Sequence, residues 1–147
     1  MELEIIDTPT DEMREAVNVQ LRVHNQTANP VFWQARERPE NDSRPLNVFA
    51  FDDDRQVVGG LFGTTQFSWL KIDIMAVTEP RRGEGVGTAL LSRAEAAGLA
   101  RGCKYAFTET MDFQAPEFYQ LAGYRVAGAI DDWDSHGHTK YFLAKDL

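Results

Sequence analysis

Three glycines, Gly83, Gly85 and Gly87, alternate with other residues directly after the arginine pair Arg81 and Arg82. Glycine adopts positive φ at no steric cost and lets a ligand approach the backbone closely. Alternating glycines can therefore turn several successive N–H groups inward to form an anion-binding nest. The two guanidinium groups add full positive charges beside these amides. This stretch predicts a binding site for a phosphate or a pyrophosphate.

The neighbouring elements must hold this loop open to a ligand. A strand is expected over residues 68–77, and Pro80, which cannot donate to a sheet ladder, ends it. Apolar residues recur at helical spacing from Val86 to Ala97, and Gly102 stands where a helix-ending glycine is expected. We therefore predict strand, glycine loop and helix in succession. The N-terminus of that helix adds a partial positive charge and free N–H donors to the phosphate site.

Two well-known phosphate loops fit this stretch less well. A Walker loop needs a lysine followed by Ser or Thr after its last glycine, but Thr88 follows Gly87 directly. A dinucleotide fingerprint needs a third glycine where Thr88 stands, although Glu109 has about the spacing of the ribose-binding acid. A six-stranded dinucleotide-binding domain would also have to surround a loop placed past the middle of the chain. A third interpretation fits better.

Two segments carry a family signature. Residues 82–87 (Arg-Gly-Glu-Gly-Val-Gly) match Arg/Gln-x-x-Gly-x-Gly/Ala, and residues 118–124 match Phe-Tyr-x-x-x-Gly-Phe/Tyr. Together with Met75-Ala76-Val77 before the loop, they resemble the GNAT superfamily of N-acetyltransferases, from about Val48 to the C-terminus. The resemblance implies a single α/β domain over residues 1–147, with a mixed, twisted sheet of about six to seven strands flanked by helices. It also implies transfer of an acetyl group from acetyl-CoA to an amine by direct attack in a ternary complex.

The resemblance further implies where acetyl-CoA is held. Backbone N–H groups of the glycine loop would bind the pyrophosphate, and the pantetheine amides would add to the free edge of the strand at residues 75–77. An N–H near Val77 would stabilise the oxyanion. The family often has Asn where Asp112 stands, so the contact with the pantetheine arm falls to Asp112 or to Gln114. The predicted cofactor-binding residues are Met75, Ala76, Val77, Arg82, Gly83, Glu84, Gly85, Val86, Gly87, Thr88, Asp112, Gln114 and Tyr119.

Three residues are predicted to be catalytic. Tyr119 is the expected general acid, because a phenol (pKa ~10) is close enough to a thiol (~8.5) to protonate the leaving thiolate. Its alternative role is that of a core aromatic. Asp73 and Glu109 are the candidates for taking the proton of the acceptor ammonium, acting through water, or holding that ammonium. An equally good alternative for Asp73 is a structural salt bridge, for instance with Lys71 or Arg125.

The sequence does not identify the acceptor amine. A polyamine, an amino acid, an antibiotic and a protein lysine all remain open. The polar segments 36–47 and 131–138 are expected to select it, with Trp33, Asp73 and His138 as predicted substrate-binding residues. The three histidines are too scattered to predict a metal site. A non-catalytic acyl-CoA-binding or regulatory module on the same fold is the alternative function.

Composition limits the partners. The 147 residues carry a formal net charge of −8 with a sequence pI near 4.8, which argues against nucleic acid and suits a cationic acceptor, or solubility alone. No apolar run approaches the ~20 residues of a membrane span, and the first residues lack the basic start of a signal peptide. The single cysteine, Cys103, fits a reducing cytoplasm. The family resemblance implies a possible homodimer.

Periodicity and turn signals predict the remaining elements. Leu3–Asp7 is expected to be a short strand. In residues 68–77, strict alternation would place Asp73 on the same face as Met75. The other expected elements are a helix capped by Thr10 and ending near Asn29, a second short helical piece from Val31, an exposed loop over 36–47, a hairpin of strands 48–51 and 56–64, a strand over 104–110 in parallel crossover, a short helix to Leu121, and antiparallel strands 124–130 and 140–144.

Overall fold

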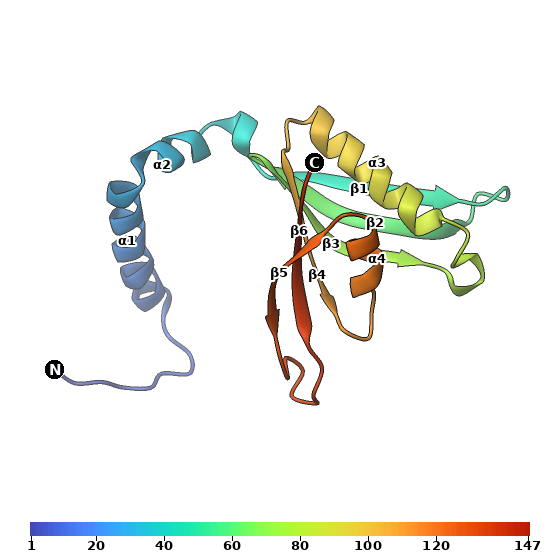
Figure 1. Ribbon diagram of the computed structural model, residues 1–147. Helices are drawn as coiled ribbons and strands as arrows, with labels where there is room; N and C mark the ends of the chain where they lie inside the picture. Colours follow the sequence, from blue (N-terminus) through green and yellow to red (C-terminus); the bar gives the residue numbers. More distant parts are fainter. The chain divides into compact units, whose positions relative to one another are not determined.

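The computed structural model describes all residues, Met1–Leu147 (Figure 1). The chain divides into two compact units, Met1–Asp42 and Ser43–Leu147, which are described separately below. The expectation of a single domain over residues 1–147 stays a prediction. None of the helices is both long and apolar enough to cross a membrane.

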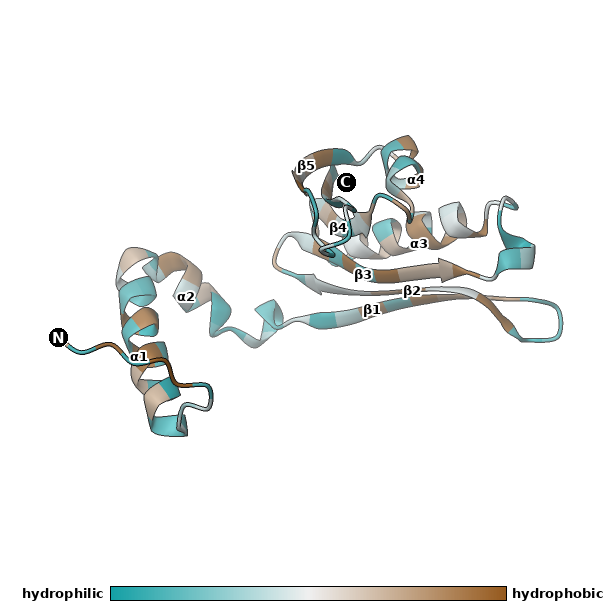
Figure 2. Ribbon diagram, turned by 90° about the horizontal axis from the view of Figure 1, so that it is seen from below, coloured by the Kyte–Doolittle hydropathy of each residue, from teal (hydrophilic) through white to brown (hydrophobic).

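The first unit is helical. Its elements are α1 (Asp11–Ala28), α2 (Pro30–Arg36) and a 3-10 turn, η1 (Pro39–Asn41). The Thr10 hydroxyl accepts a hydrogen bond from the Met13 N–H at 3.2 Å, as a helix-capping residue should. Asn29 ends α1, and its side chain accepts from the Phe32 N–H at 3.2 Å to start α2. These features confirm the predicted cap and the predicted break before Pro30. Apolar and polar bands alternate along α1 (Figure 2).

The predicted strand over Leu3–Asp7 is wrong. These residues form neither helix nor strand, and the side chain of Ile5 is fully exposed. A strand needs a neighbouring strand to take its backbone hydrogen bonds, and no strand pairs with this segment. The apolar pattern of the segment indicates only that it could pair.

The second unit is built on a six-stranded sheet with the order β1-β2-β3-β4-β6-β5. Adjacent strands are antiparallel except β3 and β4, which are parallel. This confirms the predicted mixed α/β sheet. The strands are β1 (Arg44–Phe51), β2 (Val57–Gln66), β3 (Trp69–Val77), β4 (Tyr105–Met111), β5 (Arg125–Ile130) and β6 (Lys140–Asp146).

The parallel pair is joined by a crossover through the 3-10 turn η2 (Glu79–Arg81) and helix α3 (Val86–Ala100). Helix α3 lies along the β1–β3 part of the sheet (Figure 1) and buries Leu90, Leu91 and Ala94 in the core. The helix can approach closely because Gly98 has no side chain: a Cβ there would lie 3.3 Å from a Leu70 methyl group. A short helix, α4 (Pro116–Leu121), follows β4 as predicted.

Strand β1 begins at Arg44 rather than at Val48, so the exposed loop is shorter than the predicted 36–47. Pro45 lies inside this strand, although it has no N–H to donate. The strand tolerates it because β1 is at the edge of the sheet and pairs with β2 alone.

A β-bulge reverses the alternation of β3. Ile74 lies opposite Phe62 and Ile72 lies opposite Gly63, which leaves Asp73 as an extra residue without a partner in β2. As a result Met75 turns toward the core that buries Ile72, while Ile74 is exposed. The prediction that Asp73 and Met75 share a face is therefore wrong. A Cβ at Gly63 would collide with the carbonyl oxygen of Lys71, so the bulge requires glycine there.

Candidate active site

Strands β3 and β4 separate in the middle of the sheet. Their parallel pairing runs only from Trp69 to Ile72 on β3, opposite Tyr105–Thr108 on β4. Strand β3 continues to Val77 with one edge still paired to β2 and the other edge free. The bulge at Asp73 comes at the start of this free segment. A wedge-shaped opening therefore begins near the centre of the sheet.

The backbone of β3 presents donors to this opening. The Thr78 N–H donates to the Val58 carbonyl of β2 at 2.9 Å. Because successive backbone groups of a strand point to opposite sides, the N–H groups of Met75 and Val77 point away from β2. They face the free edge, where an extended ligand with amide groups could add as another strand.

The glycine loop continues the same opening. Gly83 and Gly85 have φ values of +79° and +83°, and a Cβ at either residue would meet no atom within 4 Å. The first hydrogen bond of α3 is donated by the Ala89 N–H to Gly85 at 3.0 Å. The N–H groups of Val86, Gly87 and Thr88 therefore lack an intrahelical partner and form the positive end of the helix dipole.

The two arginines of the loop have different roles. Arg82 donates through Nε to the Val77 carbonyl at 3.2 Å, which ties the loop to the end of β3. Arg81 forms an ion pair with the Glu84 carboxylate at 2.9 Å. Glu84 thus neutralises Arg81, and the guanidinium N–H groups of Arg82 remain available to an anion.

A cavity of about 650 Å³ lies between the free edge of β3, the glycine loop and the start of α4. Ten of the predicted cofactor-binding residues line it: Met75, Ala76, Val77, Arg82, Gly83, Gly85, Val86, Gly87, Thr88 and Gln114. The cavity is also lined by Arg81, Phe113, Ala115 and Phe118, which were not predicted as cofactor contacts. For Phe118 a signal was available, because it begins the aromatic signature that contains Tyr119.

Tyr119 does not line this cavity. It lies on α4 in the hydrophobic core, 6% exposed, with its ring 5.5 Å from that of Tyr124. Its hydroxyl shares a hydrogen bond with the Thr108 side chain, and burial raises the pKa of Tyr119. The phenol therefore keeps its proton at neutral pH, one residue away from the cavity-lining Phe118.

The two predicted catalytic carboxylates are both in ion pairs. Asp73 contacts the Lys71 ammonium at 2.8 Å, the structural partner expected as its alternative role. Glu109 contacts the Lys140 ammonium at 3.0 Å. Neither carboxylate lines the cavity.

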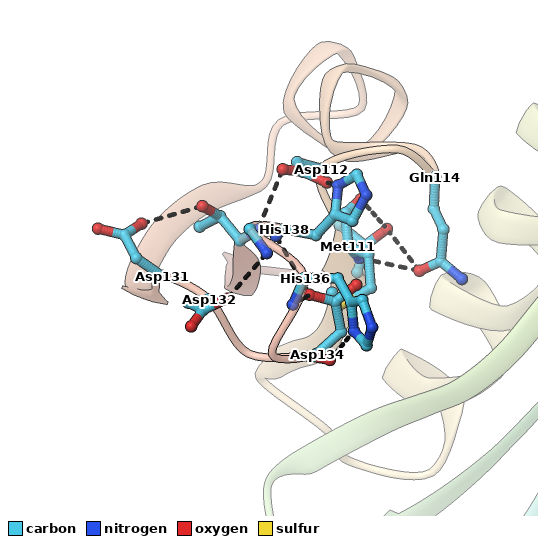
Figure 3. Close-up of polar contacts among 11 residues, drawn as sticks. Met111, Asp112, Gln114, Asp131, Asp132, Asp134, His136 and His138 are labelled. Carbon is cyan, nitrogen blue, oxygen red and sulfur yellow. Dashed lines mark hydrogen bonds and ion pairs between the residues drawn. The ribbon is translucent and has the colours of Figure 1, made fainter.

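Asp112 and Gln114 both lie in the connection between β4 and α4, but their side chains make different contacts. The Gln114 side chain oxygen accepts from the Met111 N–H at 2.8 Å, which holds this residue at the cavity wall. Asp112 instead faces the β5–β6 loop, where one carboxylate oxygen contacts His138 Nδ1 at 2.9 Å and the other accepts from the Thr139 N–H at 3.0 Å (Figure 3). Gln114 therefore lines the cavity, whereas Asp112 does not.

The other two predicted substrate-binding residues, Trp33 and His138, belong to different elements of the chain. Trp33 belongs to α2 in the first unit, where the Arg36 guanidinium lies 5.3 Å from its ring. His138 belongs to the β5–β6 loop and packs edge-on against Phe113, with ring centroids 4.8 Å apart. Phe113 lines the cavity, whereas His138 does not.

The comparisons with known proteins agree with this geometry. The sequence model of the Acetyltransferase (GNAT) family matches residues 10–124. The chain is 39% identical over 131 residues to blasticidin-S acetyltransferase of Streptomyces morookaense, which covers 86% of this chain and 96% of that protein.

Solved structures share the fold. An acetyltransferase from Bacillus cereus superimposes with a TM-score of 0.77 at 27% identity and covers 98% of both chains. A GNAT family acetyltransferase from Elizabethkingia anophelis, solved with acetyl-CoA bound, shares the fold with a TM-score of 0.60 at 17% identity, over 69% of this chain and 75% of that one. The protein therefore belongs to the GNAT family and is an N-acetyltransferase.

Proposed function

We propose that this protein transfers the acetyl group of acetyl-CoA to a primary amine of a small molecule, by direct attack of the neutral amine in a ternary complex. The single observation that carries the proposal is the cavity where two sets of backbone donors meet. The free edge of β3 contributes the N–H groups of Met75 and Val77, and the start of α3 contributes those of the glycine loop.

This arrangement suits the two ends of an acyl-CoA. The pantetheine arm carries amides that can pair with a strand edge, and the pyrophosphate suits a helix N-terminus with an arginine beside it. The Val77 N–H, or that of Met75, is then placed to stabilise the oxyanion that forms when the amine attacks the thioester. One such donor contributes ~3 kcal/mol to the transition state in comparable sites.

Tyr119 is the proposed proton donor to the leaving thiolate. Its neutral phenol lies in the core, one residue along α4 from the cavity-lining Phe118, and its hydroxyl is hydrogen-bonded to Thr108. The amine attacks the thioester carbon to form the C–N bond, the C–S bond breaks, and the sulfur takes a proton from Tyr119. The nitrogen then loses its excess proton, which restores the phenol.

The acceptor is proposed to be a small, basic amine of the antibiotic class. The relative that is 39% identical is named for blasticidin S, and the net charge of −8 attracts a cationic ligand. Asp73 and Glu109 are proposed to act on the acceptor ammonium by attraction.

A buried free thiol at Cys103, whose pKa is raised by burial, fits the reducing cytoplasm proposed for the protein.

The decisive experiment measures release of free CoA thiol from acetyl-CoA in the presence of amines. The panel contains blasticidin S, a polyamine, free lysine and a lysine peptide, and the products are identified by mass spectrometry. Turnover with blasticidin S or another small amine is the expected result. Tight CoA binding by calorimetry without turnover on any amine would instead indicate a binding module, and absence of CoA binding at millimolar concentration would remove the proposal. Light scattering on the same sample tests the proposed homodimer.

A further inference from the structure

The carboxylate of Asp112 and the imidazole of His138 form a pair that the proposed transfer reaction does not yet use. Asp112 Oδ1 contacts His138 Nδ1 at 2.9 Å, and Asp112 Oδ2 accepts the Thr139 N–H at 3.0 Å. The backbone is joined as well, because the Asp112 N–H donates to the Thr139 carbonyl at 2.9 Å. The carboxylate is thus held from two sides and orients the ring, so that its second nitrogen, Nε2, is left for another partner.

The loop that carries His138 is organised by its own acidic residues. Asp134 Oδ1 accepts the N–H groups of His136 at 2.9 Å and His138 at 3.2 Å. Asp132 accepts the Gly137 N–H at 2.8 Å, and Asp131 accepts the Thr139 hydroxyl at 2.9 Å. Figure 3 shows these side chains gathered around the loop. The loop thereby holds the imidazole in one place instead of leaving it on a mobile arm.

Backbone strain is concentrated in the same loop. Asp132 and Ser135 have φ values of +52° and +61°, in a region that costs non-glycine residues of order 1–3 kcal/mol each. Gly137 has a φ of +89°. Such strain persists only where surrounding contacts maintain it, and the hydrogen bonds to Asp131, Asp132 and Asp134 do so here.

His138 also contacts the wall of the cavity, although it is not itself a lining residue. Its ring packs edge-on against Phe113, at a centroid distance of 4.8 Å, and Phe113 is part of the cavity wall. About 45% of the His138 side chain is exposed, so an amine and solvent can both reach it. The two candidate carboxylates are less suited to accepting a proton, because Asp73 and Glu109 are each already paired with a lysine ammonium group.

We propose that His138 is the general base that takes a proton from the acceptor ammonium, and that Asp112 is the residue that positions it. This inference rests on the acetyl transfer proposed above. The ammonium gives one proton to His138 Nε2 and becomes a neutral amine, which can then form the C–N bond. His138 returns to its neutral form by releasing that proton to solvent. The charged groups that face the ring are Asp112, from the end of β4, and Asp134, from its own loop.

The test compares the pH dependence of kcat/KM, with saturating acetyl-CoA and blasticidin S or the best amine of the panel, for wild type, His138→Gln, Asp112→Asn and His136→Asn. We expect His138→Gln to be slower than wild type by about 100-fold at neutral pH. The difference in kcat/KM between wild type and His138→Gln should narrow above about pH 10, where the acceptor amine is already neutral. Asp112→Asn should show a smaller loss with the same narrowing, and His136→Asn should follow wild type.

A structural role for His138 would give a different result. The His138→Gln profile would then run parallel to wild type at every pH, or its acetyl-CoA affinity would fall, and either result overturns the proposal. Wild type that turns over no amine contradicts the proposed function, and the base assignment with it. Turnover by wild type with an unchanged His138→Gln profile overturns the base assignment alone.

Discussion

The Nε of Arg82 donates to the Val77 carbonyl at 3.2 Å, which joins the glycine loop to the last residue of the free strand edge. The two places where acetyl-CoA is proposed to bind, the loop and the strand, are therefore held together by one side chain. The fork geometry of a guanidinium makes this possible, because one N–H can bind the carbonyl while the others face an anion.

Replacement of Arg82 should weaken acetyl-CoA binding. Arg82→Ala removes the proposed charge-assisted hydrogen bond to the diphosphate and the observed tie to the Val77 carbonyl, and we expect the Kd for CoA to rise about 10- to 100-fold. Arg82→Lys keeps the charge but not the planar set of guanidinium donors, so its Kd for CoA should lie between those of wild type and Arg82→Ala. Calorimetric titration with CoA measures both. Equal affinity in all three proteins would show that Arg82 does not contact the ligand.

Gly85→Ala should lower both stability and affinity. A residue with a side chain at a φ of +83° costs about 1–2 kcal/mol, and no contact in the free protein offsets this cost. Gly102→Ala is the matched control: its φ of +88° gives the same strain in an equally open position at the other end of α3. Urea unfolding should show similar losses for both variants, while CoA binding should weaken only for Gly85→Ala. A parallel loss of binding in Gly102→Ala would contradict a local role.

Tyr119→Phe should lower kcat at least about tenfold and leave the KM for acetyl-CoA little changed, because a proton donor acts on the leaving thiolate and not on binding. Tyr124→Phe is the control. It removes the hydroxyl of a buried neighbour that does not line the cavity, so it should affect neither constant. Steady-state kinetics that show an unaltered kcat for Tyr119→Phe would assign the tyrosine to the core alone.

The ion pair between Glu95 on α3 and Lys145 on β6 should contribute to stability. The two groups lie 2.8 Å apart, and only 15% and 24% of their side chains are exposed. Lys145→Met leaves the Glu95 carboxylate without its counter-ion in a partly buried position. We expect the free energy of unfolding to fall by about 2 kcal/mol, between the values typical of exposed and of fully buried pairs. A denaturation midpoint equal to that of wild type would show that the pair contributes nothing.

Stability should also depend on Asp112 at acid pH. The Thr139 N–H, followed by His138, lowers the pKa of the Asp112 carboxyl below its ordinary value of 3.8. A carboxyl with a lowered pKa in the folded protein stabilises it above the ordinary pKa, and this contribution is lost as the pH falls through the lowered value. The difference in urea midpoint between wild type and Asp112→Asn should therefore be larger at pH 6 than at pH 3. A difference that does not change with pH would contradict the assigned cause.

Local sequence determined much of the fold. The Thr10 cap, the break at Asn29-Pro30 and the ends of α3 depend on contacts within a few residues, and each was predicted correctly. The turn at Gly83 and Gly85 was also predictable from the sequence, because it depends on glycines that tolerate positive φ. Phosphate binding by this loop stays a prediction.

The pairing of distant segments was decided only by the tertiary structure. The run Leu3–Asp7 has the pattern of a strand, but no strand pairs with it. Alternation placed Asp73 and Met75 on one face, whereas the bulge opposite Phe62 and Gly63 separates them. A bulge arises from two strands at once, so neither strand alone reveals it.

The contacts of charged side chains depend on the same long-range geometry. Asp73 and Glu109 carry the right chemistry for a base, but each was brought against a lysine. Asp112 and His138, separated by 26 residues, were brought together because β4 pairs with β6 and the β5–β6 loop folds back over the end of β4. Residue types and short spacings therefore determined the local elements and the proposed ligand, and the pairing of the strands decided which side chains meet.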